Sequence, residues 1–290
     1  ETGKMTLILH GTKTSSILNS VLAEIHSLKK KDSVKFSRKN ENIKPFESGG
    51  ETSLEFFSSK TDCSLFLFGS HSKKRPNNLV IGRTYDHHIY DLVEVGIENF
   101  RSMASFTYDK KFAPQNGSKP FIVFIGEAFE SSDELKQLKE ILLDLFHGEA
   151  ITKLNLAGLD RIYVCAALSS NRIFFSHCAL RLKKSGTTTP KIELIEVGPS
   201  MDMVMRRNRP PNDILRKEAM KTAPELRKKK EKNVVKDAVV GKIGKIYIPD
   251  QKVGSVPLDN KSKGLKRERR EAKTKGGDDW KKKKKKHKQN

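Results

Sequence analysis

Cysteine is scarce in this chain: Cys63, Cys165 and Cys178 are the only three among 290 residues, and no two of them have C-x-x-C spacing. Each lies in an apolar run of strand length, which is typical of buried core thiols in a reducing compartment. Apolar runs of about 18 residues are missing too, and the N-terminal segment lacks a signal-peptide pattern, so we expect an intracellular protein without a membrane partner. The chain opens at Glu1 rather than at methionine, and we expect native residues before it.

The common catalytic motifs are missing as well. The chain has no G-x-x-x-x-G-K-[ST], no G-x-G-x-x-G after a strand, no H-E-x-x-H and no G-x-S-x-G. Glu193 and Glu196, three residues apart on an expected strand, point to opposite faces and are poor partners for acid–base catalysis. His87 and His88 would diverge by about 100° at a helix start, which favours a solvated pair over metal ligands. We therefore expect no catalytic residues, metal, cofactor or small-molecule substrate.

Negative charge is scarce at the C-terminal end. Residues 206–290 hold 30 Lys and Arg against 11 Asp and Glu, a net charge of +19, which leaves only +3 of the total +22 for residues 1–205. A polycation of this density indicates a polyanionic partner. Beyond residue 223 there is little apolar material and the clustered cations repel one another, so we expect residues 224–290 to form a disordered basic tail.

Hydrophobic periodicity predicts a mixed α/β body before that tail. Residues 17–28 have one apolar face at the helical period, with Ser15 or Ser16 as the cap, and the polar stretch from there to Gly50 is expected to be an extended arm. Residues 1–50 would thus be an N-terminal helix and arm. Further on we expect strands at 65–68, 79–81 and 121–125, a helix at 87–100, and a helix at 135–145 that follows the capping-box pair Ser131 and Glu134 and is ended by Gly148.

Strands dominate the second part of the body. Residues 161–168 and 172–183 have hairpin spacing, while 191–197 and 201–207 flank Gly198 and Pro199, which predicts a second reversal. A last helix is expected within residues 208–223, capped by Asn212 or Asp213. Two adjacent α/β halves of similar size, about 51–150 and 151–207, suggest a duplicated architecture.

Cations gather in the expected loops of the body, where they can converge on phosphates from a rigid base. Pro76, Asn77 and Asn78 would hold the first loop in one shape. The alternative for each cation is a solvated surface position. The phenylalanines lie mostly in apolar core runs and no RNP motif is present, which favours recognition of folded RNA by shape and backbone contacts. The expected RNA-binding residues are Lys73, Lys74, Arg75, Arg83, Lys183, Lys184, Arg206, Arg207 and Arg209 in the body, and Lys228, Lys229, Lys230, Lys266, Arg267, Arg269 and Arg270 in the tail.

Several segments resemble a known family. Residues 73–83, KKRPNNLVIGR, and residues 192–200, IELIEVGPS, look like characteristic stretches of the Brix-domain ribosome assembly proteins. Together with residues 52–57, TSLEFF, and 66–71, FLFGSH, the first of them closely resembles the ribosome production factor 2 branch, and the similarity covers about residues 15–221. The resemblance implies a Brix fold, a two-part α/β structure over residues 51–207, in agreement with the duplication.

The resemblance also implies a function. Members of this branch are nucleolar assembly factors of the large subunit that form a heterodimer with a regulator-of-ribosome-synthesis protein. They help bring the 5S ribonucleoprotein, with its 5S rRNA and two ribosomal proteins, to the large-subunit rRNA of the pre-ribosome. Binding in the family rests on basic surfaces and the tail, no catalytic residues carry over, and Gly198 and Pro199 match a family turn.

Two alternatives stay open beside this assembly scaffold. The body could be a protein-interaction module alone, with the lysine clusters serving nuclear import and nucleolar retention. An RNA-processing enzyme such as a nuclease is the least favoured, because the sequence offers neither a metal-binding carboxylate cluster nor a nucleophile–base pair.

Overall fold

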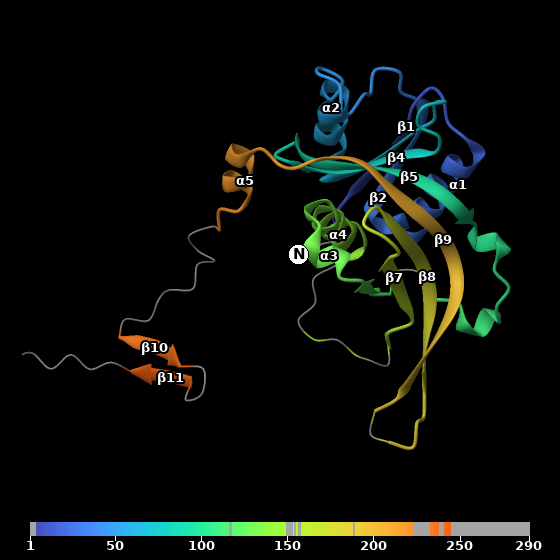
Figure 1. Cartoon of the computed structure of the whole chain (residues 1–290), viewed down its shortest axis with the longest axis vertical. Helices are drawn as coiled ribbons and strands as arrows, with labels where there is room; N and C mark the ends of the chain where they lie inside the picture. Colours follow the sequence, from blue (N-terminus) through green and yellow to red (C-terminus); the bar gives the residue numbers. More distant parts are fainter. Residues whose placement is uncertain are drawn as a thin grey trace, which may run out of the picture. The chain divides into compact units, whose positions relative to one another are not determined.

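The computed structural model describes residues 4–115, 118–148, 153, 155, 158–187, 189–222, 233–237 and 241–244 (Figure 1). Two compact units divide the chain, Glu1–Lys221, which we call the body, and Thr222–Asn290, which we call the tail. In the tail, the described residues form an antiparallel ribbon of β10 (Val234–Asp237) and β11 (Gly241–Gly244), where we expected no regular structure. The tail cations predicted to bind RNA, at 228–230 and 266–270, lie outside the described residues.

The body is built on a nine-stranded mixed sheet with the order β2-β1-β3-β4-β5-β9-β8-β7-β6. Short helices connect its strands. The strands are β1 (Thr6–His10), β2 (Ser33–Lys39), β3 (Leu65–Ser70), β4 (Asn78–Tyr85), β5 (His88–Arg101), β6 (Phe121–Ile125), β7 (Arg161–Ala167), β8 (Arg172–Lys183) and β9 (Lys191–Arg209). The helices are α1 (Ser16–Leu28), α2 (Thr52–Thr61), α3 (Ala128–Ser131), α4 (Asp133–Phe146) and α5 (Asp213–Ala219), with 3-10 turns at Lys30–Asp32, Met103–Ser105 and Lys110–Phe112.

The sheet contains one arrangement twice, which confirms the duplicated α/β fold. In the first group β1 runs parallel to β3, and β3, β4 and β5 follow as an antiparallel meander. In the second group β6 runs parallel to β7, and β7, β8 and β9 repeat the meander. The groups join where β5 pairs antiparallel with β9. Because β6 pairs with β7, the second group begins near residue 121 and not near residue 150, where we had placed the boundary.

Two cores lie on the two faces of this sheet. The larger one packs α1 and α4 against strands of both groups (Figure 1). The smaller one is formed by the opposite face of β1, β3 and β4 with α2 and the segment around Ile43. Amphipathic spacing explains the helices: Leu18, Val21, Leu22 and Ile25 of α1 are all buried, and the side chain of Ser15 accepts a hydrogen bond from Leu18 N at 3.1 Å, as its predicted capping role requires.

Most of the elements expected from periodicity are confirmed. The strands β3, β4, β6, β7 and β8 lie where the apolar runs predicted them, and α1, α4 and α5 are helices. The cap of α4 is Ser132 rather than Ser131, and Gly148 follows its last turn with φ of +65°. Asn212 caps α5 by accepting a hydrogen bond from Ile214 N at 3.1 Å. All three cysteines are buried, and burial raises the pKa of Cys165 to about 12.

The predicted helix at 87–100 is wrong, because this segment is strand β5. Asp86 and His87 both have positive φ, +48° and +63°, and close a two-residue turn in which Tyr85 pairs with His88. In the strand, Val93, Val95 and Ile97 alternate onto the larger core. Apolar residues at 89, 92, 93, 97 and 100 also fit a helical period, so the spacing alone could not decide.

Two further expectations are corrected. Gly198 and Pro199 do not reverse the chain: β9 continues through them, with Cys178 opposite Glu196 and Ser176 opposite Ser200. Two residue steps along β8 therefore lie opposite four along β9, so β9 has a β-bulge at Gly198, whose φ is +73°. The expected extended arm is part of the sheet, because residues 33–39 form strand β2, which pairs with β1. We did not predict β2.

Candidate nucleic-acid interface

The loop between β3 and β4, residues 71–77, is held in one shape by its own hydrogen bonds. Arg75 N donates to Ser72 Oγ at 3.1 Å, and Asn77 N donates to His71 Nδ1 at 3.1 Å. Asn77 has φ of +45°, which asparagine tolerates, and its Oδ1 accepts a hydrogen bond from Ser15 Oγ at 2.6 Å. The loop is thereby fixed to the start of α1.

Three predicted RNA-binding residues lie on this loop. Lys73 and Lys74 are exposed, and neither forms an ion pair with any other residue that the structure describes. Arg75 is half-exposed, with Nη1 at 3.5 Å from Glu94 Oε1. The loop therefore offers two lysines to solvent and directs its arginine back toward the sheet.

The end of β9 reaches the same place. Arg207 makes a two-pronged contact with Glu94, its Nη2 donating to Oε1 at 3.0 Å, and its guanidinium lies 4.0 Å from the centre of the Phe46 ring. Arg206 donates to Asn78 Oδ1 at 2.7 Å and to Pro76 O at 2.8 Å. Burial alone would raise the pKa of Glu94, but the hydrogen bonds from Arg207 and Asn78 outweigh it and lower that pKa. Glu94 is therefore an ionised anchor that holds loop and strand end together.

Arg83 is enclosed by ion pairs within the body. Its guanidinium is mostly buried and contacts Asp91 at 2.5 and 2.9 Å and Asp144 at 2.9 Å, with Glu140 at 3.3 Å. Asp144 and Glu140 belong to α4, so Arg83 ties the first strand group to a helix of the second. The RNA-binding role of Arg83 stays a prediction, since spacing places a cation near a turn but does not say which carboxylates fold against it.

The remaining predicted residues are dispersed. Arg209 is paired with Glu51 at the start of α2. Lys183 donates to Glu193 at 2.8 Å, and Lys184 is exposed just after it, at the tip of the β8–β9 hairpin. Because Lys183 pairs with Lys191 at the beginning of β9, this tip lies at the opposite end of the strand from Arg206 and Arg207. The structure therefore brings 73–75 and 206–207 together and leaves 183–184 apart.

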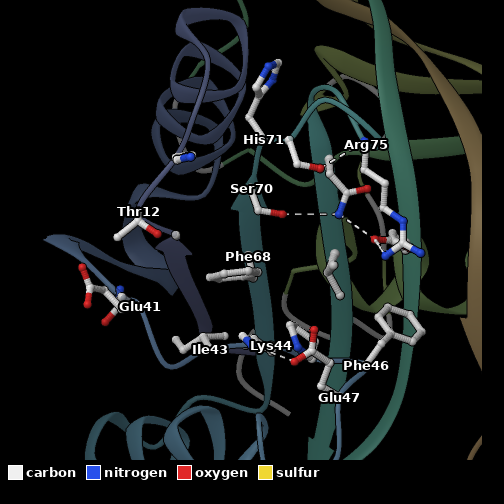
Figure 2. Close-up of a pocket in the computed structure, with 18 of the residues that line it drawn as sticks. Thr12, Glu41, Ile43, Lys44, Phe46, Glu47, Phe68, Ser70, His71 and Arg75 are labelled. Carbon is white, nitrogen blue, oxygen red and sulfur yellow. Dashed lines mark hydrogen bonds and ion pairs between the residues drawn. The ribbon is translucent and has the colours of Figure 1, made fainter.

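A hollow of about 310 Å³ opens beside the loop, and sequence analysis missed it (Figure 2). Its rim carries Lys13 and Lys44, and its wall includes Phe46 and the anchor Glu94. The apolar run at residues 7–9 could have revealed strand β1, and with it Lys13 in the loop that follows. Nothing in the spacing of Phe46 or Glu94 indicates that the fold joins them.

In the part of the chain that the structure describes, no group of three or more His, Cys, Asp or Glu side chains is arranged to hold a metal ion. No helix in the same residues is long and apolar enough to cross a membrane.

Fold and site together define an α/β scaffold that presents cations on braced loops. The chain belongs to the Brix domain family, whose model matches residues 11–207. It is 66% identical to "Ribosome production factor 2 homolog" of Arabidopsis thaliana over 95% of this chain and 88% of that one, and 44% identical to the Homo sapiens protein of the same name over 81% and 74%. Among solved structures, it resembles a "probable ribosomal biogenesis protein from Aeropyrum pernix K1", with 11% identity and a TM-score of 0.45, over 72% of this chain and all of that one.

These relatives confirm the resemblance to the ribosome production factor 2 branch. The role of the chain is accordingly in ribosome biogenesis.

Proposed function

We propose that the chain is a non-enzymatic assembly factor of the large ribosomal subunit that binds rRNA and protein partners together. It helps incorporate the 5S ribonucleoprotein into the pre-ribosome. Its partners are 5S rRNA and large-subunit rRNA, a regulator-of-ribosome-synthesis protein with which it forms a heterodimer, and the ribosomal proteins of the 5S particle. Its place of action is the nucleolus.

One observation carries the RNA-binding part of this proposal. Lys73 and Lys74 are exposed cations on a loop that is held by α1, by its own hydrogen bonds and by Arg206 from β9. Cations on a braced loop keep a fixed spacing, which can match the phosphates of a folded RNA. The tail adds the larger share of positive charge, and its contacts would be sequence-independent.

Charge reversal at the loop tests the proposal. In the full-length chain, Lys73→Glu with Lys74→Glu should weaken binding to 5S rRNA by about tenfold or more and should make the salt slope shallower by about two. The measurement is fluorescence anisotropy of labelled 5S rRNA between 50 and 200 mM salt, with excess tRNA to occupy the tail.

The matched control is Lys110→Glu with Lys111→Glu, which makes the same charge change at two exposed lysines of another loop. The control should bind nearly as well as the wild type. Equal affinity of both double variants would instead favour the alternative, a protein-interaction module whose cations serve only localisation.

A further inference from the structure

Three parallel strands end together at one edge of the sheet. β1 pairs in parallel with both β2 and β3, and His10 at its end lies opposite Lys39 on one side and Gly69 on the other. The loops that follow these three strands therefore start side by side. They contribute Thr12 and Lys13 after β1, Asn40 and Glu41 after β2, and His71, Ser72 and Arg75 after β3 to the lining of one hollow (Figure 2).

The chain leaves this edge toward both faces of the sheet. After β1 it enters α1, which packs into the larger core, and after β2 it runs through Ile43 to α2, which packs into the smaller core. Neighbouring parallel strands whose connections diverge in this way leave a crevice between them. In open α/β sheets, ligands bind at such a crevice outside the carboxyl ends of the strands.

The hollow at this crevice combines an apolar floor with a cationic rim. Its volume of about 310 Å³ is at the small end of the range for ligand sites. Ile43, Phe68 and Val80 are buried in the floor, and the half-buried ring of Phe46 stands at one side beneath the Arg207 guanidinium. The cations that line the hollow are Lys13, Lys44, Arg75 and Arg207.

The charges and the hydrogen-bond donors of the hollow favour an anionic ligand. Four cations line the hollow against the three carboxylates Glu41, Glu47 and Glu94. Lys44 is paired with Glu47 at 2.9 Å, and Arg75 and Arg207 with Glu94, while exposed Lys73 and Lys74 stand on the adjoining loop. Lys13 is exposed and forms no ion pair with the described residues. The hydroxyls of Ser70 and Ser72 each accept a hydrogen bond from the protein and donate none within the described residues, so both can donate to a ligand.

We propose that this hollow holds one unstacked nucleotide of the bound RNA, with its base against the Phe46 and Phe68 side and its phosphate toward Lys13 and the 71–77 loop. The inference rests on the proposed function, because it names what part of the RNA the same surface receives. Proteins that recognise RNA by sequence splay out single bases and stack them on aromatic rings or guanidinium planes, and the Phe46–Arg207 pair offers both. The Asp and Glu side chains of an acidic peptide would use the cations but carry no aromatic ring for the apolar wall.

The test fills the hollow without changing any charge. Thr12, exposed on its rim, is replaced by Trp, and Thr107, exposed on a distant loop, is replaced by Trp as the matched control. A second variant, Phe46→Leu, keeps the bulk of the wall and removes its aromatic face. The full-length chain is bound to 5S rRNA and to single-stranded RNA that contains 4-thiouridine, with free UMP as competitor for the RNA. The complexes are photocrosslinked, and mass spectrometry identifies the peptides attached to the RNA.

We expect wild-type crosslinks in the peptides that line the hollow, 40–47 and 66–72. Thr12→Trp should abolish them and weaken RNA binding about tenfold, with a salt slope that becomes shallower by no more than about one. Phe46→Leu should weaken binding about 5- to 100-fold, and Thr107→Trp should behave as wild type. UMP should compete only at concentrations at least a hundredfold above those of the RNA.

Three outcomes overturn the inference. If RNA binding is salt-dependent but is altered by neither Thr12→Trp nor Phe46→Leu, the hollow is not a nucleotide site, and the proposed function still holds. UMP binding as tight as RNA binding makes the hollow a site for a free nucleotide instead. Wild-type protein that does not bind RNA at all removes both the inference and the RNA-binding function on which it rests.

Discussion

At the scale of single residues, the partners of a cation decide whether it can meet RNA. Lys73 and Lys74 face solvent, Arg75 and Arg207 share Glu94, and Arg83 is enclosed by Asp91 and Asp144. All five were equivalent by charge and spacing in the sequence. Only the fold separates them, because Glu94, Asp91 and Asp144 come from segments whose pairing the spacing of basic residues does not reveal.

Arg83 provides the first residue-scale prediction. Its replacement by Ala leaves the buried carboxylate of Asp91 without its cation, which should lower the free energy of unfolding by about 3–5 kcal/mol. Chemical denaturation followed by circular dichroism measures the change. The matched control is Arg101→Ala, whose ion pair with Glu196 at 3.5 Å is exposed and should contribute less than about 1 kcal/mol.

The same variant separates structure from binding. Under conditions where Arg83→Ala is folded, its affinity for 5S rRNA should equal that of the wild type. A variant of unchanged stability that has lost RNA affinity would restore Arg83 to the binding surface and contradict the structural role.

At the scale of elements, the bulge in β9 is held by a buried side chain of β8. His177 Nδ1 donates to Gly198 O at 2.6 Å, and the imidazole ring lies 5.0 Å from the Tyr163 ring of β7. Burial lowers the pKa of His177 from 6.5 to about 4. The neutral ring therefore connects three strands at the point where β9 departs from regular pairing.

This histidine predicts an acid sensitivity of the β7–β8–β9 meander. As pH falls below 6.5 the unfolded chain binds a proton at this position while the folded chain does not, so stability is lost until pH reaches about 4. Between pH 7.5 and 5.0 the group should cost about 2 kcal/mol. Urea denaturation at the two pH values measures the loss, which His177→Phe should remove.

The control is His88→Ala, because His88 is exposed. This variant should keep the pH dependence of the wild type. If His177→Phe also loses stability in parallel with the wild type from pH 7.5 to 5.0, the buried histidine is not its cause.

The type of an element was predictable where its hydrophobic period and its flanking residues agreed. The prediction failed where the helical and the strand period both fitted one segment. The sequence pattern was unambiguous for the apolar stripes of α1 and α4 and for the β7–β8 hairpin. Residues 88–101 fitted a helix as well as a strand, and the turn at Asp86 and His87 lacks the Asn-Gly signal that would have decided. Gly198 and Pro199 suggested a turn, since the sequence does not say that β8 continues alongside both flanks.

At the scale of the whole molecule, duplication was visible from the sequence as two α/β halves, but the boundary was not. The linking segment 102–120 separates two four-strand groups that meet through β5 and β9, strands far apart in sequence. The hollow depends on the arrangement of the whole sheet, because the loops that follow β1, β2 and β3 meet only where these strands are parallel neighbours. Local patterns cannot predict such a site, since each loop is unremarkable by itself.

The division into body and tail gives the last prediction. The body is a compact unit that contains both cores, whereas the tail, residues 222–290, carries a net charge of +15 out of the +22 of the chain. A chain that ends at Lys221 should therefore keep its circular dichroism spectrum and its partner binding. It should bind RNA much more weakly, because most phosphate contacts and the counterions that they release are lost.

Salt dependence distinguishes this cause from misfolding. If the full-length chain neutralises about six to ten phosphates, its RNA affinity should fall by about 10³ to 10⁵ between 50 and 200 mM salt, and the truncated chain should show a much shallower slope. The remaining slope should become shallower again when Lys73 and Lys74 are reversed, because the loop belongs to the body. Loss of partner binding together with RNA binding would place the tail in the protein interface, and an unchanged slope would mean that the tail cations do not contact the RNA.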